Sequence, residues 1–371
     1  MKTAIVHDWL YSLAGAEKVV EAIYELYPSP IHTLIVNRAN MQESSLPLDQ
    51  ITPSFLQKLP KATTKYPWYL PLFPLAIESL DLCYADVILS SSSCVAKNIL
   101  TKSNQLHICY CHTPMRYIWD MHFEYLKSHH LDQGVKSFLT KILFHHLRTW
   151  DLAHAQRVDH YIANSHTVAK RIYKTYRKKA LVIYPPVDVN FFSQTTEKKE
   201  DFYLTASRLV PYKKVDVIIQ AFSKLSDKKL VVIGDGPELN SLKKIAGKNV
   251  EFLGKVSNTV LRTYMKKAKA FIYMALEDFG ILPVEAQAAG LPVIAFNQGG
   301  CKETVLCSKT GVFVEDQSPS ALIQGILSFE KLENTFEPSF LQKHAAKFSK
   351  ENFLSSYQKA VEGWIEDFKK E

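Results

Sequence analysis

The stretch Glu277-Asp-Phe-Gly-Ile-Leu-Pro-Val-Glu285 determines how the rest of the chain is interpreted. The apolar run 270–275 before it and the run 291–296 after it are each predicted to form a buried strand. Between the two runs, Pro283 suits the first turn of a helix and Gly290 suits its end. The sequence therefore predicts a strand, a turn, a short helix and a second strand.

Two carboxylates flank the start of this predicted helix. Glu277 lies where the first strand stops, and Glu285 lies just inside the helix. The backbone N–H groups of Phe279, Gly280 and Ile281 would point out of the helix start, where they suit an anionic or hydroxyl-rich ligand. Solvated surface glutamates are the common alternative. Open α/β sheets bind ligands at the carboxyl ends of their strands, which favours a binding site here.

Length and composition indicate a soluble globular protein with two domains. The chain has 371 residues, of which 47% are hydrophobic and 22% charged, with a formal net charge of +8. Residues 1–186 contain 20 Lys and Arg against 14 Asp and Glu, a net +6, and 12 of the 13 histidines. This asymmetry suits an anionic partner such as a membrane surface, and a solvated basic surface explains it almost as well. We expect no nucleic-acid partner.

The cysteines and the N-terminus indicate a cytoplasmic protein. The six cysteines show no Cys-x-x-Cys spacing, so free thiols in a reducing compartment are expected rather than disulfides or zinc ligands. The first residues turn polar too early for a secretory signal, and no apolar run approaches transmembrane length. Any membrane contact is therefore expected to be peripheral, on the cytosolic face of the inner membrane.

Strands alternating with helices predict parallel sheets covered on both faces. The break at 185–190, followed by the polar run 193–201, is the predicted domain boundary. Residues 37–75 are interpreted as a loop region with an exposed apolar face, or one packed under neighbouring helices. Residues 348–368 are predicted to form an amphipathic helix. The expected strands are 4–7, 31–36, 86–90, 106–110, 161–163, 181–184, 202–206, 230–233, 250–253, 270–275 and 292–296.

Cations and glycines follow several strands of the predicted second domain. Arg208 and Lys213 straddle a proline-containing loop, as two cations gripping one diphosphate would, although solvated loop charges are the alternative. Gly234 and the pair Gly299-Gly300 follow two other strands, where glycine permits close approach of a ligand or serves only the turn. Convergence of four such loops at one sheet edge favours a site more than any single motif does.

The first domain offers fewer candidates. Gly15 opens a helix after the first strand, where the backbone can approach a phosphate. His112 and Arg116 follow a strand ending near residue 110, which places them at the same edge of the sheet. The pairs His129-His130 and His145-His146 lack metal-binding spacing, so no metal site is expected. The serine run 90–93 lacks the Gly-x-Ser-x-Gly elbow, which excludes hydrolase chemistry on it.

These residues resemble the motifs of the glycosyltransferases of family 4. Residues 277–285 are similar to that family's Glu-x7-Glu element with its Phe-Gly pair. Gly15-Ala-Glu-Lys-Val19 resembles its Gly-Gly-x-Glu-Arg-Val loop, with Ala14 in place of one glycine and Lys18 in place of arginine. The other similar motifs are Ala163-Asn-Ser165, Tyr184-Pro-Pro-Val-Asp188, Arg208 with Lys213, Gly234-Asp-Gly-Pro237 and Gly299-Gly300-x-x-Glu303.

The resemblance implies a retaining, metal-independent hexosyltransferase without a cofactor, on the GT-B fold. That fold has two Rossmann-like doubly wound α/β domains facing a central cleft and a C-terminal helix that crosses back to the first domain. The implied domains are 1–186 for the acceptor, 187–347 for the nucleotide-sugar donor, and 348–371 for the returning helix.

The resemblance also implies roles for individual residues. Arg208 and Lys213 would neutralise the departing diphosphate, Glu285 would hold the ribose hydroxyls, and Glu277 would hold the donor sugar. His112 would meet the reacting sugar, and Arg116 is a candidate on the acceptor side. The remaining donor-binding candidates are Gly15, Gly234, Phe279, Gly280 and Ile281.

A narrower resemblance concerns the substrate. Residues 90–97, followed by Cys111-His-Thr-Pro-Met-Arg116-Tyr-x-Trp119-Asp120, are most similar to bacterial mannosyltransferases of O-antigen and exopolysaccharide assembly. This implies transfer of mannose from GDP-mannose to a lipid-linked or cell-surface glycan. The alternatives are the same fold with a UDP-sugar donor, or a regulatory protein that binds a sugar nucleotide without catalysis. Oligomeric state and linkage stay open.

Overall fold

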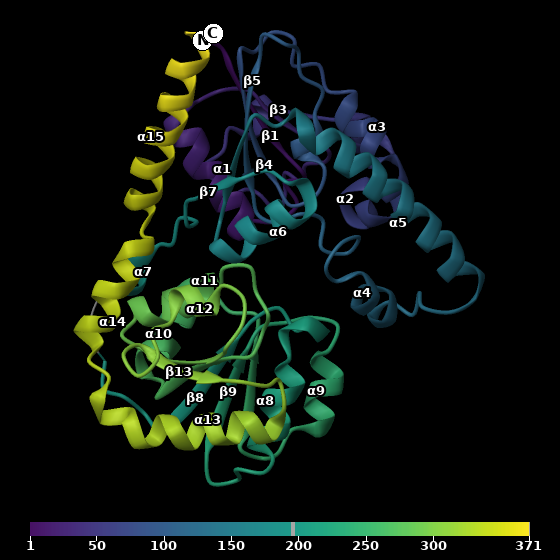
Figure 1. Ribbon diagram of the computed structural model, residues 1–371. Helices are drawn as coiled ribbons and strands as arrows, with labels where there is room; N and C mark the ends of the chain where they lie inside the picture. The colour runs from purple at the N-terminus through teal and green to yellow at the C-terminus, as the bar shows by residue number, and fades with distance from the viewer. Residues whose placement is uncertain (194–196, 371) are drawn as a thin grey trace. The chain divides into compact units, whose positions relative to one another are not determined.

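The computed structural model describes residues 1–193 and 197–370, and the chain forms two compact units. Unit 1 comprises Met1–Pro186 and Phe353–Glu371, and unit 2 comprises Val187–Asn352. Residues 194–196, inside the polar run predicted to mark the domain boundary, and residue 371 lie outside the described residues. Each unit contains one sheet of parallel strands with helices between them (Figure 1).

The sheet of unit 1 has seven strands in the order β3-β2-β1-β4-β5-β6-β7. Every residue of β4 and β5 is buried, as expected for parallel strands covered on both faces. In the register, Ile5 lies opposite Ile31 on one side and Leu89 on the other. The strands are β1 (Thr3–His7), β2 (Ile31–Thr33), β3 (Ile51–Pro53), β4 (Val87–Ser92), β5 (Leu106–Cys111), β6 (His160–Ala163) and β7 (Ala180–Val182).

Helices pack apolar faces against this sheet. The largest is α5, whose Phe144 and Leu147 are buried in the same cluster as Phe73 and Ile77 of α3. Trp150 Nε1 of α5 donates a hydrogen bond to Glu78 Oε1 of α3 at 2.8 Å. These helices are α1 (Gly15–Leu26), α2 (Ala62–Lys65), α3 (Phe73–Glu78), α4 (His122–Ser128), α5 (Gly134–His154) and α6 (His166–Tyr176).

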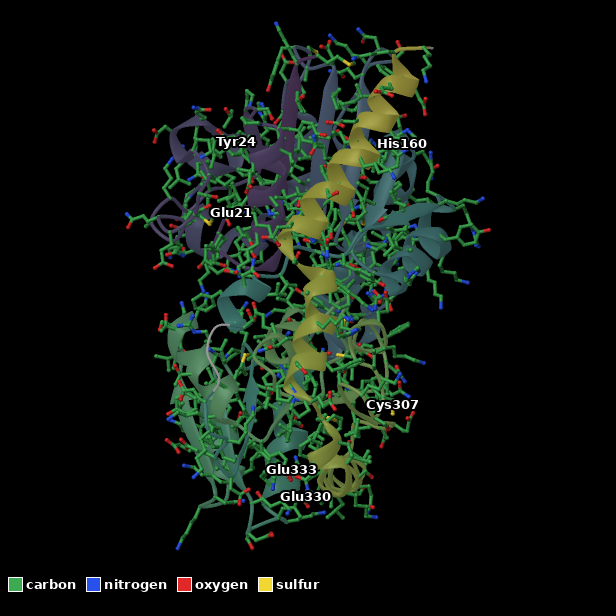
Figure 2. The ribbon with its side chains drawn as sticks, turned by 90° about the vertical axis from the view of Figure 1, so that its left-hand side faces the viewer. Glu21, Tyr24, His160, Cys307, Glu330 and Glu333 are labelled. Atoms are coloured by element: carbon green, nitrogen blue, oxygen red, sulfur yellow. The ribbon has the colours of Figure 1, made fainter. Side chains whose placement is uncertain are left out.

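The C-terminal helix α15 (Lys350–Phe368) packs on unit 1. Phe353, Tyr357 and Val361 recur every four residues and are all buried, because this spacing places them on one helix face. The ring of Phe353 contacts that of Tyr110 in β5 at 5.7 Å. His160, labelled beside the helix in Figure 2, stacks on Trp364 at 4.4 Å. The predicted return of this helix to the first domain is confirmed.

The interpretation of residues 37–75 as a loop region is wrong. This segment contains β3, α2, the start of α3 and several 3₁₀ turns. Phe73 is buried in the core of unit 1, whereas Trp68 and Leu75 are 66% and 59% exposed. The apolar pattern was missed because β3 is a three-residue edge strand and the helices are interrupted by prolines.

Unit 2 has a six-stranded sheet in the order β10-β9-β8-β11-β12-β13. The sequence did not predict β13, a four-residue strand at the edge of the sheet. The strands are β8 (Phe202–Ala206), β9 (Lys229–Ile233), β10 (Val250–Gly254), β11 (Ala270–Tyr273), β12 (Val293–Phe296) and β13 (Gly311–Val314). The helices are α7 (Val189–Ser193), α8 (Val215–Phe222), α9 (Leu239–Ile245), α10 (Asn258–Lys267), α11 (Ile281–Ala288), α12 (Cys301–Thr304), α13 (Pro319–Leu332) and α14 (Pro338–Ala345).

Both sheets have the strand order of doubly wound α/β proteins, in which the order reverses next to the first strand of the sheet. The predicted fold class, two Rossmann-like α/β units with a returning C-terminal helix, is confirmed. In unit 1 the reversal lies between β1 and β4, and in unit 2 between β8 and β11. Ligands of such sheets bind at the carboxyl ends of the strands beside that reversal.

Candidate active site

The predicted cation loop and acid loop of unit 2 follow the two strands at the reversal point. β8 and β11 are hydrogen-bonded neighbours, although the chain passes through β9 and β10 between them. Lys213 ends the short 3₁₀ turn after β8, and Glu277 lies four residues after β11. The structure therefore brings the carboxyl ends of these two strands, with their charged loops, to the same place.

Lys213 and Glu277 form an ion pair at this point. The Lys213 ammonium donates to Glu277 Oε1 and also to the Tyr273 hydroxyl, the latter at 3.3 Å. The side chains of Lys213 and Glu277 are only 13% and 20% exposed. Arg208, in the same loop as Lys213, is exposed and has no ion-pair partner within 1–193 and 197–370.

Two opposing effects act on the pKa of Lys213. Burial lowers it, while Tyr273 and the Glu277 carboxylate raise it, and the net result is a pKa above its ordinary value. Burial raises the pKa of the Tyr273 phenol, which stays neutral at physiological pH. The site thus contains a permanent ammonium ion held by one carboxylate. An incoming diphosphate can compete with that carboxylate for the ammonium.

The glycines of the flanking loops make close contacts inside the protein. A Cβ atom at Gly234 would lie 1.8 Å from the carbonyl oxygen of Ser207. A Cβ at Gly299 would lie 2.3 Å from the carbonyl oxygen of Glu277, and Gly300 N–H donates to that carbonyl at 2.8 Å. Glycine is therefore required here so that the loops after β9 and β12 can pack on those after β8 and β11.

The helix α11 begins directly after a glycine with a positive φ angle. Gly280 adopts φ +88° before the first helical residue, Ile281, a conformation that glycine adopts without strain. Phe279 is buried against Phe348 at 5.5 Å between ring centres. Glu285, in the second turn, is 6% exposed, so it is not an ordinary solvated glutamate.

In unit 1, Asp8 organises the loop after β4. Asp8 directly follows β1, and its carboxylate accepts backbone hydrogen bonds at 2.6–2.8 Å from four consecutive residues. These residues are Ser93, Cys94, Val95 and Ala96. The serine run 90–93 is therefore structural: Ser90 bonds His107, Ser91 bonds His112, and Ser92 and Ser93 bond Asp8.

His112 lies beside this reversal point among several polar side chains. Its Nε2 is 2.8 Å from Ser91 Oγ, and its carbonyl accepts from Asn164 Nδ2 at 3.0 Å. His7 Nδ1 is 2.8 Å from the carbonyl oxygen of Ser91, and His7 Nε2 is 4.0 Å from the Glu17 carboxylate. Burial, with a smaller effect of His7, lowers the pKa of His112 to about 3, so the imidazole is neutral at physiological pH.

The other two candidates of unit 1 are Gly15, at the start of α1, and Arg116, in the turn that follows His112. Gly15 is the first residue of α1, and Glu17 Oε2 accepts the N–H of Ala14 at 3.1 Å. Arg116 Nε lies 3.9 Å from Asp120 Oδ2, which also binds Arg171 Nε at 2.9 Å. Arg116 is thus part of a charged group with Asp120 rather than an isolated cation.

Lowering the pH is expected to destabilise unit 1 through His107. This histidine is fully buried, and burial lowers its pKa to about 3. Below pH 6.5 the unfolded chain binds a proton that the folded chain does not, so stability is complete above that pH and decreases as the pH falls towards 3. The expected loss is up to about 1.4 kcal/mol per pH unit for this one group.

The measurement is urea unfolding at pH 7, 6 and 5, compared with the His107→Gln variant, which has no titrating group at this position. Its stability should depend less steeply on pH than that of the natural protein. Equal slopes would show that His107 protonates in the folded state.

Several side chains of these sites were not predicted from the sequence. Tyr273, which contacts Lys213, reads as an ordinary strand residue. The positions of Asp8 and Glu17 could have indicated them from the sequence. Asp8 directly follows β1, and Glu17 lies in the first turn of the next helix, α1. Among residues 1–193 and 197–370, no three His, Cys, Asp or Glu side chains are grouped as metal ligands.

Two family models match the chain. The model for glycosyltransferase family 4 matches residues 15–191, and the model for glycosyl transferases group 1 matches residues 187–352. Together they span both units. The chain belongs to the glycosyltransferases of family 4, with the GT-B arrangement of two α/β units.

Two relatives of known activity are similar in sequence to part of this chain. A GDP-mannose-dependent α-(1-6)-phosphatidylinositol monomannoside mannosyltransferase of Mycobacterium tuberculosis is 37% identical over 129 residues, 30% of this chain and 34% of that protein. The O-antigen chain mannosyltransferase RfbU of Salmonella typhimurium is 32% identical over 169 residues, 43% of this chain and 47% of that protein. The chain spans less than two thirds of the length of these relatives.

A solved structure with the same fold covers almost the whole chain. Anabaena HepE in complex with UDP-glucose superimposes with a TM-score of 0.72 at 16% identity, over 98% of this chain and 100% of HepE. At this identity the likeness concerns the fold. Within the described part of this chain, no helix combines the length and apolar character needed to cross a membrane.

Proposed function

We propose that this protein is a retaining glycosyltransferase that moves mannose from GDP-mannose to a lipid-linked or cell-surface glycan. The observation that carries the proposal is the ion pair of Lys213 and Glu277 at the strand-order reversal of unit 2. The names of the M. tuberculosis and S. typhimurium relatives, both mannosyltransferases, support mannose as the sugar.

In the proposed reaction, unit 2 binds the donor. The diphosphate replaces Glu277 as the ion-pair partner of the Lys213 ammonium, and Arg208 supplies a second, exposed cation. The two cations then stabilise the negative charge that develops on the leaving diphosphate, in the role that a metal ion has in other transferases. Glu277, released from Lys213, is free to accept hydrogen bonds from the sugar hydroxyls, and Glu285 accepts those of the ribose.

The N–H groups at the start of α11 add to the donor site. Those of Phe279, Gly280 and Ile281 are proposed to bind the donor, aided by the positive end of the helix dipole. Gly234 is proposed to let the donor approach the loop after β9. The bond between the anomeric carbon and the diphosphate oxygen breaks, and the acceptor hydroxyl attacks that carbon from the same face through an oxocarbenium-like state. The proton of the hydroxyl passes to the departing diphosphate, which leaves as GDP.

Unit 1 is proposed to bind the acceptor. The neutral imidazole of His112 suits a hydrogen bond to a sugar hydroxyl, since a histidine with a pKa of about 3 is not protonated to imidazolium at physiological pH and so does not act as a general acid. Arg116 is proposed to contact the acceptor, and Gly15 to let a phosphate approach the start of α1. The excess positive charge of residues 1–186 suits contact with an anionic membrane that carries the acceptor.

The proposal is tested by incubating the protein with GDP-mannose or UDP-glucose and a membrane extract that contains acceptor glycans. We expect release of GDP and transfer of labelled mannose, with turnover unchanged by EDTA. Preference for UDP-glucose, the donor seen in the HepE complex, would support the same chemistry with another donor. If the protein binds sugar nucleotides but releases neither GDP from GDP-mannose nor UDP from UDP-glucose, the regulatory alternative is favoured. Loss of turnover in EDTA, restored by Mg²⁺ or Mn²⁺, would refute metal independence.

A further inference from the structure

The outward face of α5 carries a stripe of exposed apolar side chains. Val135, Phe138, Leu139 and Ile142 are 76%, 65%, 60% and 41% exposed. Their spacing of three and four residues places them on one side of the helix, and we call them the outer stripe. Apolar side chains exposed together in this way mark an interaction surface more often than scattered single ones do.

The outer stripe is separate from the face by which α5 is held in unit 1. Phe144, Leu147 and Asp151 of α5 are buried, on the opposite side of the helix. Trp150 and His154 both bond the carboxylate of Glu78 in α3, each at 2.8 Å. Figure 1 shows α5 as a long helix whose N-terminal part extends beyond the other helices of unit 1. Core packing therefore does not explain the apolar residues of the stripe.

Positive charge flanks the stripe on both sides. At about 100° per residue, Lys136 lies on one side of the stripe and Lys141 on the other, and both are exposed. The one acidic residue of α5, Asp151, is fully buried and paired with Lys97 at 2.8 Å. The outward face of α5 thus combines apolar side chains with two exposed lysines, while the exposed Asp132 lies just before the helix. This is the composition of helices that lie in a membrane interface.

We propose that the outer stripe of α5 inserts into the interface of an anionic lipid membrane, with Lys136 and Lys141 at the phosphate groups. The proposal deepens the proposed function and rests on it for its purpose, since a lipid-linked acceptor lies at such a surface. Phe123 of the preceding helix α4 is 81% exposed as well, and its neighbour His122 lies against Phe144 in the middle of α5, at 5.7 Å between ring centres.

Charge argues against a second copy of this chain as the occupant. In a symmetric dimer the same patch contacts itself, so the lysines beside one stripe would approach those beside the other. Stable protein interfaces also use about 20–30 residues a side, far more than the few that form the stripe. An anionic lipid surface has neither difficulty. It attracts the lysines, and a small apolar area is enough for insertion into its interface.

The test is cosedimentation of the full chain with vesicles of phosphatidylcholine alone or with one quarter phosphatidylglycerol. We expect binding to the anionic vesicles only. The Phe138→Ser/Leu139→Ser variant should bind at least about tenfold more weakly. The Lys136→Glu/Lys141→Glu variant should lose at least about tenfold as well, given about fivefold for each lysine.

Matched controls are taken from exposed residues of unit 2. Ile245→Ser/Leu327→Ser removes two exposed apolar side chains, and Lys244→Glu/Lys248→Glu makes the same charge change. Both controls should bind like the natural protein, and circular dichroism verifies that all variants are folded. Absence of binding by the natural protein, or equal binding by the stripe variants, would overturn the proposal. Self-association that the stripe variant abolishes, without vesicle binding, would identify a second copy as the occupant instead.

Vesicle binding needs no donor, so its outcome is separable from that of the transfer assay. If the stripe variants lose vesicle binding but release GDP from GDP-mannose like the natural protein, both the membrane-binding role of the outer stripe and the proposed transferase activity are supported. If vesicle binding depends on the stripe but no donor is used, the proposed function is wrong and the membrane surface stands.

Discussion

Replacing Lys213 with alanine is expected to lower the rate of mannose transfer at least about 100-fold. Removal of one group that stabilises developing charge in an active site typically costs a factor of about 10² to 10³. The Lys213 side chain is only 13% exposed, and its ammonium contacts Glu277 and Tyr273. The rate is measured as GDP released from GDP-mannose in the presence of acceptor.

The neighbouring residue supplies a control with the same loss of charge. Lys214 has φ +56°, a left-handed conformation that asparagine tolerates, so Lys214→Asn removes a cation with little backbone strain. We expect this variant to keep transfer within about fivefold of the natural protein, because it is Lys213, and not the half-buried Lys214, that bonds Glu277 and Tyr273. Equal losses in the two variants would indicate a general effect of charge rather than a role of Lys213.

Glu277 and Lys213 are expected to act as a unit. Glu277→Gln keeps the size of the side chain and removes its charge, and it should also lower transfer at least about 100-fold. Because the two residues are in direct contact, the loss in the Lys213→Ala/Glu277→Gln variant should be smaller than the product of the two single losses. Multiplicative losses would mean that the residues act independently.

Replacing Asp151 with alanine is expected to destabilise unit 1 by about 3–5 kcal/mol, the usual cost of leaving a buried charge without its partner. Asp151 and Lys97 are both fully buried, and they are 2.8 Å apart. The second carboxylate oxygen accepts from Trp119 Nε1 at 2.8 Å and from the Tyr176 hydroxyl at 2.7 Å. The group thus connects α5 to α6 and to the loop that follows His112.

The measurement is the free energy of urea unfolding of unit 1, at a pH above 7. The Lys97→Met/Asp151→Ala variant is the control, because it removes the buried charge together with its partner and should recover part of the lost stability. A single variant within about 1 kcal/mol of the natural protein would contradict the prediction, since it would show that Lys97 is not a buried, charged group.

The fold was predictable from the sequence where strands are long and apolar. Runs such as 202–206 and 106–110 correspond to β8 and β5, because strands buried on both faces form continuous apolar stretches. The edge strands β3 and β13 were missed, since three or four residues give too little pattern. The strand order, which brings β8 next to β11, follows from pairing between distant parts of the chain.

In the candidate site, too, the sequence indicated individual residues, whereas their contacts required the structure. The residue types and their positions after strands pointed to Lys213 and Glu277, but their mutual contact required the structure. The glycine at 234 reads as a ligand-binding signal in the sequence, and the structure adds a packing requirement, because a Cβ there would meet the carbonyl oxygen of Ser207. The hydrogen bond between Ser91 and His112 could not be predicted from the sequence, because Ser91 lies in β4 and His112 directly follows the neighbouring strand β5.

The most direct test of the central claim, that Lys213 binds the diphosphate of the donor whose sugar Glu277 holds, is calorimetric titration of GDP into the natural protein and Lys213→Ala at one fixed salt concentration. We predict that the variant binds GDP at least about tenfold more weakly, as loss of a charged hydrogen bond of about 1.5–3 kcal/mol requires. Guanosine, which has no diphosphate, should bind both proteins equally weakly. Equal affinity of the two proteins for GDP would contradict the account.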